Sequence, residues 1–299
     1  MGTSNSFSGS GGGKPLIPSW ISNGGYESPA SPSPAPPIPP TAASVPAPSN
    51  PTPAIPPAPA LPPMPAGGDK NRFTSARSNF TRFATSGGHD RRSLGRSLSR
   101  YVSTSAGGSR TAAQRMGASR QSSAQLASFL SGAMANGPRE ALRSLNLGNL
   151  AGRPIEEIFI GMMDYVCPEG GSIDDSIARE AFIETIADLA ENGLTDFDAL
   201  NAAQLQTILE LYATHAIEAR LCNDIGAKTV SMPSNVVEAE SVQAQLFDFI
   251  RRSVSDALTA GIAAVEAMTP TRVLGFVTGV YEQAFAILQS MGEAEEGAQ

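Results

Sequence analysis

From residue 138 onward, apolar residues recur at the three- and four-residue spacing that places them on one face of an α-helix. In the stretch SIDDSIAREAFIETIADLAENG, the apolar set includes Ile177, Phe182, Ile186 and Leu189. Ser172, with Asp175 three positions later, predicts the N-terminal cap of this helix. Asn192-Gly193 predicts its end, because glycine readily adopts the left-handed conformation found after helices.

Further helices are marked by similar signals. Pro138 in PREALRSL and Pro154 in PIEEIFIGMMDYV are expected in first helical turns, where the missing N–H of proline costs no hydrogen bond. The stretch TDFDALNAAQLQTILELYATHAIEARLCNDIG predicts one long helix after another cap. Residues 234–268 and 270–291 predict two more.

Signals for β-strands are almost absent, and only residues 228–232 are expected to be extended. We therefore expect residues 123–292 to form an acidic all-α domain, an irregular bundle of about six to eight helices. Residues 293–299 are expected to be a disordered tail.

Residues 69–122 predict a basic helical connector. Its apolar side chains share one side of two short helices: Phe73, Ala76, Phe80 and Phe83 in the first, and Leu94, Leu98 and Tyr101 or Val102 in the second. Its arginines include Arg92, Arg96, Arg100, Arg110, Arg115 and Arg120. Gly95 and several serines weaken the second helix, so we expect it to need a surface to fold against. The helix that follows the connector should stop near Asn136-Gly137.

The N-terminal residues 1–68 have a different composition. Residues 28–65 hold 17 of the 24 prolines and no charged residue, so they offer little apolar surface for a core. We expect residues 1–68 to be a disordered Gly/Ser- and Pro-rich arm, with the proline tract acting as an extended spacer.

The net charge of −7 conceals a polarity along the chain. Residues 70–120 contain 11 Lys and Arg and one acidic residue, whereas residues 139–299 contain 9 basic and 25 acidic residues. Attraction between the two regions is one interpretation, and a docked acidic partner is another. Nucleic-acid binding through the six arginines is the alternative function, although no recognised nucleic-acid motif accompanies them.

Catalytic motifs are absent from the sequence: there is no P-loop, no dinucleotide-binding GxGxxG after a strand, no HExxH and no paired-cysteine metal spacing. His215, Glu218 and Cys222 share roughly one face of a helix and offer a hydrolase hypothesis. A buried histidine beside a helical acid is the more common situation. Cys167 is interpreted as a structural thiol. We expect no catalytic residue, no metal and no cofactor.

The first residues carry the most specific local hypothesis. Removal of Met1 would leave a free glycine amine at Gly2, although MGTSNS also matches the myristoylation pattern. Leu16, Ile17 and Trp20 lie in PLIPSWI, which either packs back on the body or serves as a short docking motif. No signal peptide or transmembrane segment is evident, and two widely spaced cysteines fit a reducing compartment, so we expect a soluble cytoplasmic protein.

Blocks along most of the chain resemble one protein family. They include MGTS, GGGKPLIPSW, NRFTSARSNFTRFATSGG, LGRSLSRYVSTSAGGSRTAAQRMGASR, DYVCPEGGSIDDSIAREAFIETIADLA and LYATHAIEARLCNDIG. This combination is similar to the B component of the Qat anti-phage defence system, the QatB family.

The resemblance implies a bacterial protein encoded with an ATPase, a QueC-like protein and a TatD-like nuclease. It also implies a non-enzymatic adaptor whose N-terminal glycine is modified with a deazaguanine group by the QueC-like partner. Carried onto this sequence, Gly2 is the expected acceptor, and Thr3 and Ser4 are expected to help its recognition.

Overall fold

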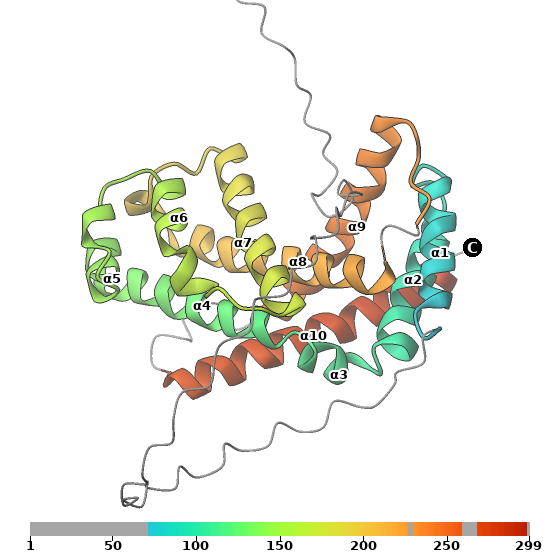
Figure 1. The fold of residues 1–299 in the computed structure, drawn as a ribbon, viewed down its shortest axis with the longest axis horizontal. Helices are drawn as coiled ribbons and strands as arrows, with labels where there is room; N and C mark the ends of the chain where they lie inside the picture. Colours follow the sequence, from blue (N-terminus) through green and yellow to red (C-terminus); the bar gives the residue numbers. More distant parts are fainter. Residues whose placement is uncertain (1–70, 227–229, 259–267, 298–299) are drawn as a thin grey trace, which may run out of the picture. The chain divides into compact units, whose positions relative to one another are not determined.

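The computed structural model describes residues 71–226, 230–258 and 268–297 (Figure 1). Ten α-helices and three shorter helical turns occupy these ranges, in which no strand forms. The α-helices are α1 (Thr74–Thr85), α2 (Arg91–Arg100), α3 (Ser109–Gln114), α4 (Gly117–Asn136), α5 (Pro138–Ser144), α6 (Ile155–Val166), α7 (Ile173–Glu191), α8 (Ala202–Ile225), α9 (Val236–Ala257) and α10 (Pro270–Gly297). A π-helical turn, η1 (Tyr101–Ser105), and two 3-10 turns, η2 (Gly148–Leu150) and η3 (Phe197–Ala199), complete the set.

The expected all-α fold class is therefore confirmed, with seven α-helices from α4 onward. The expected disordered arm, residues 1–68, lies outside the described residues. So does part of the segment expected to be extended, while Val230 to Met232 form no strand.

Local signals fix several helix ends where the sequence predicts them. The backbone N–H of Asp175 donates to Ser172 Oγ at 3.1 Å, and the Asp175 carboxylate accepts from the backbone N–H of Ser172 at 3.0 Å. This reciprocal capping box satisfies two donors that a helix start leaves free. A C-terminal signal also acts as predicted: α4 ends at Asn136 because Gly137 turns the chain at φ +86°. Pro138 is then the first residue of α5.

Aromatic side chains fill the core between α4, α6, α7 and α8. The rings of Phe159 and Phe182 stack with centroids 5.6 Å apart, and the ring of Phe129 stacks on Phe197 at 5.5 Å. Tyr212 of α8 is fully buried and donates its hydroxyl to the carbonyl oxygen of Ala178 in α7 at 3.3 Å. Helix α8 is thereby held against α7, and it also contacts α1, α4 and α9.

The basic connector packs into the same compact unit as the acidic helices, which spans Lys70–Gln299. Helix α4 runs without interruption across residue 122, where the sequence suggested a boundary. Helix α10 lies along α2, α3, α4 and α9 (Figure 1). The apolar residues predicted to share one face of the second connector helix, Leu94 and Leu98 among them, are buried.

The crossing of α2 and α10 depends on two glycines. A methyl group placed on Gly95 would lie 2.7 Å from the carbonyl oxygen of Gly292, and one placed on Gly292 would lie 2.6 Å from the carbonyl oxygen of Gly95. Real Cβ atoms do not approach a backbone oxygen so closely. Gly95 thus weakens α2 as an isolated helix but permits the contact that supplies its folding surface.

Helix α10 continues to Gly297, beyond residue 292, where the sequence suggested a disordered tail. Arg96 Nε of α2 lies 2.9 Å from Glu296 Oε1, and Arg91 Nε lies 3.3 Å from Glu295 Oε1. Carboxylates near a helix C-terminus oppose the helix dipole, and these arginines offset that cost. The partners are about 200 positions apart in the chain, so no local pattern reveals them.

Replacing Gly95 with Ala should destabilise the protein by about 1–3 kcal/mol, the usual cost of forcing an extra carbon into a tightly packed contact. Gly279→Ala in α10 is the matched control, because its added methyl group meets nothing within 4 Å. That control should be neutral or stabilise by up to about 1 kcal/mol, because alanine favours helix. Urea denaturation measures both, and equal effects of the two substitutions would contradict the role given to the crossing.

Candidate functional site

The N-terminal candidates lie outside the described residues. They are Gly2, Thr3, Ser4, Leu16, Ile17 and Trp20. The candidates that the structure places are the six arginines of the connector and the His215 group.

Three of the connector arginines face α10. Arg96 pairs with Glu296, Arg110 Nε lies 3.6 Å from Glu282 Oε1, and Arg120 Nη1 donates to Thr278 Oγ1 at 2.9 Å. Each pair at the surface adds little stability, but it places a carboxylate or hydroxyl where a phosphate would have to bind.

Arg115 instead enters a partly buried network around Asp224. The Asp224 carboxylate accepts from the Tyr101 hydroxyl at 3.1 Å and lies 3.4 Å from both Arg115 Nη2 and Arg220 Nε. Arg220 also donates through Nη1 to Asp174 Oδ1 at 2.9 Å. Burial lowers the pKa of Arg115, while Asp224 opposes that shift. The network joins η1, α7 and α8 and has a structural function.

The remaining two arginines, Arg92 and Arg100, lie near the two ends of α2. Arg100 is exposed at the C-terminal end of α2. Arg92 is also exposed, but it interacts with another group of the protein. At least four of the six arginines therefore contact acidic or polar groups of the same compact unit. These contacts favour the interpretation of attraction between the two regions over nucleic-acid binding.

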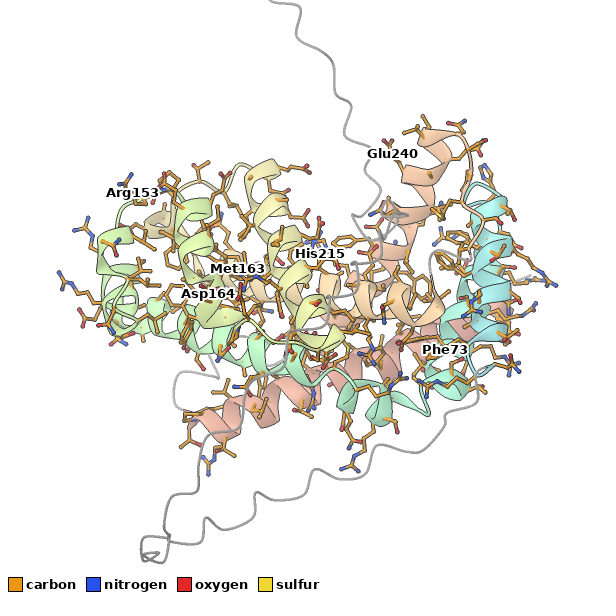
Figure 2. The ribbon with its side chains drawn as sticks, viewed as in Figure 1. Phe73, Arg153, Met163, Asp164, His215 and Glu240 are labelled. Carbon is orange, nitrogen blue, oxygen red and sulfur yellow. The ribbon has the colours of Figure 1, made fainter. Side chains whose placement is uncertain are left out.

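His215 lies on α8 (Figure 2) and is oriented by a carboxylate that the sequence pattern did not identify. Its Nε2 atom is 2.9 Å from Asp188 Oδ2 of α7, and its Nδ1 atom is 3.9 Å from Glu218 Oε2. The ring also packs against Phe247 of α9, with centroids 4.9 Å apart. Asp188 and His215 are 27 positions apart on different helices, so helical spacing could not connect them.

The thiol and the acid near His215 have strongly shifted pKa values. Burial, followed by the nearby Glu218 and Glu180, raises the pKa of the Cys222 thiol well above its usual range. Burial likewise raises the pKa of Glu218 to about 7. A cysteine nucleophile must be a thiolate near neutral pH, so Cys222 in this environment is unsuited to the hydrolase hypothesis.

Cys167 is a buried thiol at the C-terminal end of α6. Its Sγ atom donates to the carbonyl oxygen of Ala178 at 3.3 Å and lies 3.9 Å from the Tyr212 hydroxyl. Burial raises its pKa, which keeps the thiol protonated. Within the described ranges, no group of His, Cys, Asp and Glu side chains has the arrangement needed to hold a metal ion.

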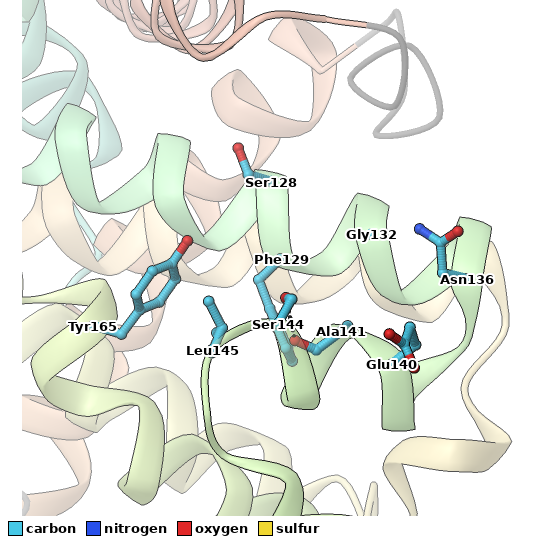
Figure 3. A pocket seen from close by; sticks show the side chains of 9 residues that line it. All are labelled: Ser128, Phe129, Gly132, Asn136, Glu140, Ala141, Ser144, Leu145 and Tyr165. Carbon is cyan, nitrogen blue, oxygen red and sulfur yellow. Dashed lines mark hydrogen bonds between the residues drawn. The ribbon is translucent and has the colours of Figure 1, made fainter.

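A small pocket lies between α4 and α5 beside Tyr165 of α6 (Figure 3). Its volume is about 160 Å³, and its lining residues are Ser128, Phe129, Gly132, Asn136, Glu140, Ala141, Ser144, Leu145 and Tyr165. Glu140 already accepts from Arg143 at 3.3 Å, and the Ser144 hydroxyl donates to the carbonyl oxygen of Ala141 at 2.7 Å. Both polar side chains are thus engaged by neighbouring residues of α5.

The fold and these contacts define an all-α protein in which arginines of the basic N-terminal helices pair with acidic residues of the helices that follow. Residues 107–288 match the model of a protein family described as Qat anti-phage system associated protein QatB. This match covers more than half of the chain, so the chain belongs to the QatB family and is a component of an anti-phage defence system.

The family predicted from the sequence is thereby confirmed. No curated protein and no solved structure matches the chain. Among the helices of the described ranges, none has both the length and the apolar character required to span a bilayer.

The raised pKa of Glu218 predicts a pH dependence of stability. The folded protein binds this proton more tightly than the unfolded chain, whose pKa is near 4.5, so stability should fall as pH rises from about 4.5 to 7. Glu218→Gln should therefore stabilise the protein at pH 8 by on the order of 2 kcal/mol and change little at pH 4.

Thermal unfolding at the two pH values measures this effect. Glu157→Gln is the control, because Glu157 is exposed on α6, where it pairs with Arg153 at 3.4 Å. A gain for Glu218→Gln that is the same at both pH values would show that ionisation of Glu218 is not its cause.

Proposed function

We propose that this QatB-family protein is a non-enzymatic adaptor that presents the amine of Gly2 to a QueC-like partner for modification with a deazaguanine group. The observation that carries the proposal is the contrast between two parts of the sequence. An uncharged Pro/Ala/Ser tract links the MGTS start to helices in which many ionisable groups engage one another.

The chemistry suits an N-terminal glycine. An α-amine has an ordinary pKa of about 7.7–8.0, so a useful fraction is unprotonated and nucleophilic near neutral pH. Glycine has no side chain to hinder approach of this amine to an active site. Thr3 and Ser4 would offer hydroxyl groups for recognition, and Leu16, Ile17 and Trp20 would provide an apolar docking motif.

The helical unit would act as the body that holds the partners together. The partners that we propose are the QueC-like protein, the ATPase and the TatD-like nuclease of the same system. We also propose a cytoplasmic location, in keeping with two cysteines that are both free thiols. The environment of Cys222, which disfavours a thiolate, supports the non-enzymatic assignment.

Intact-mass measurement after co-expression with the QueC-like protein tests the proposal. The wild-type chain should lose Met1 and gain the mass of one deazaguanine group. A single group is expected because the chain has one α-amine, whose low pKa leaves it partly unprotonated near neutral pH. Gly2→Pro should gain no mass and should lose phage protection. Gly9→Pro, the same substitution seven positions later, should behave as wild type.

Two results would refute the modification. One is an unmodified wild-type N-terminus in cells that resist phage. The other is full protection by Gly2→Pro, which lacks the unhindered primary amine.

A further inference from the structure

The α6–α7 hairpin, Ile155–Glu191, has an unusually apolar exposed surface. Seven large apolar side chains stand out as exposed within the described ranges, and four of them belong to this hairpin: Ile160, Tyr165, Ile173 and Ile183. Single exposed apolar residues are ordinary, but a group of them often marks a binding surface.

The two helices of the hairpin are antiparallel. At one end, the backbone of Pro154 forms an isolated antiparallel β-bridge with Asp196, which follows α7. Towards the other end, Arg179 Nη1 of α7 lies 3.1 Å from Asp164 Oδ1 of α6 (Asp164 is labelled in Figure 2). In two antiparallel neighbours, the residues that follow a facing pair turn towards the same side of the hairpin.

This geometry makes Ile160 and Ile183 neighbours on one exposed face. Each directly follows a member of the stacked pair Phe159 and Phe182, whose rings lie between the two helices. The same face carries the ion pair just described, one helical turn from each isoleucine. Ile160 is 61% exposed and Ile183 is 51% exposed, so neither side chain contributes fully to the core.

The hairpin that carries this apolar pair is rich in acidic residues. The hairpin contains ten acidic residues and one basic residue, Arg179. That guanidinium is already held by Asp164, by the carbonyl oxygen of Cys167 at 3.1 Å and by Glu169 at 4.0 Å. The hairpin has no spare cation of its own.

Five acidic residues of the hairpin have no cationic partner within the described part of the chain: Glu156, Asp175, Glu180, Glu184 and Glu191. Burial and the neighbouring Glu184 raise the pKa of Glu180, as expected for a carboxyl without a counter-charge. Three of the four acids of α10 differ, since Glu282, Glu295 and Glu296 each face an arginine.

We infer that this hairpin face docks another protein component of the Qat system through an apolar centre surrounded by Lys and Arg. Such a partner would bury Ile160 and Ile183 and supply the missing positive charge. Phosphate backbones and anionic membrane surfaces would be repelled by the acidic rim, and so would the same face of a second copy. The inference does not depend on modification of Gly2.

The test compares two pairs of equally exposed residues in the full-length protein. Ile160→Ser/Ile183→Ser alters the docking face, and Val236→Ser/Val237→Ser alters the start of α9, where the side chains are 65% and 70% exposed. Because all four side chains are largely in water, both variants should keep the wild-type melting temperature. Each of the other purified Qat proteins is titrated against the three forms by isothermal titration calorimetry.

One Qat protein should bind the wild-type chain, lose at least tenfold in affinity with the hairpin variant and lose less than twofold with the α9 variant. Binding should also weaken as salt is raised, and Glu184→Lys should weaken it further. Unchanged binding by the hairpin variant, equal loss by both variants, or no binding to the wild type would overturn the inference. Loss of self-association alone would identify a second copy as the occupant and would also overturn it.

Discussion

The close crossing of α2 and α10 is the constraint on which the arrangement of the helical unit depends. Backbone meets backbone there because Gly95 and Gly292 leave no side chain between the helices. That proximity lets Leu94 and Leu98 reach the core and lets Arg91 and Arg96 reach the last turn of α10. The packing of the connector and the neutralisation of its charge are two results of the same contact.

Charge is distributed unevenly after this internal pairing. The arginines of the connector neutralise α10 and, through Arg115, the buried Asp224. The acids that pair with connector arginines belong to α8 and α10, whereas five of the ten acids of the α6–α7 hairpin have no cationic partner among the described residues. A protein with a modest net charge can therefore present a strongly acidic surface, because its cations are committed to another part of the same fold.

Features that depend on neighbours in sequence could be predicted, and features that depend on distant contacts could not. The capping box of Ser172 and Asp175 and the end of α4 at Gly137 are local, and the sequence located both. The packing role of Gly95 could not be predicted, because a glycine in a helix is simply unfavourable until the helix that packs against it is known. The full length of α10 could not be predicted either, because the arginines that pair with its last turn lie on a helix that is distant in sequence.

The candidate site shows the same division. Helical spacing associated His215 with Glu218, yet the closer contact is with Asp188 on another helix. The arginine positions were identified, but their acidic partners lie on α8 and α10 and follow no spacing rule. The exposed Ile160 and Ile183 could not be told from core residues, because periodicity marks apolar positions without showing which of them a neighbouring helix covers.

The separation of about 200 positions between Arg96 and Glu296 also has a consequence for biosynthesis. At ordinary translation rates, α2 leaves the ribosome roughly 10–40 s before α10 is complete. During that interval the surface of α2 that contacts α10 has no partner, and α2 is a weak helix by itself. The segment that joins the N-terminal arm to the helices is thus secured only when synthesis of the chain is nearly finished.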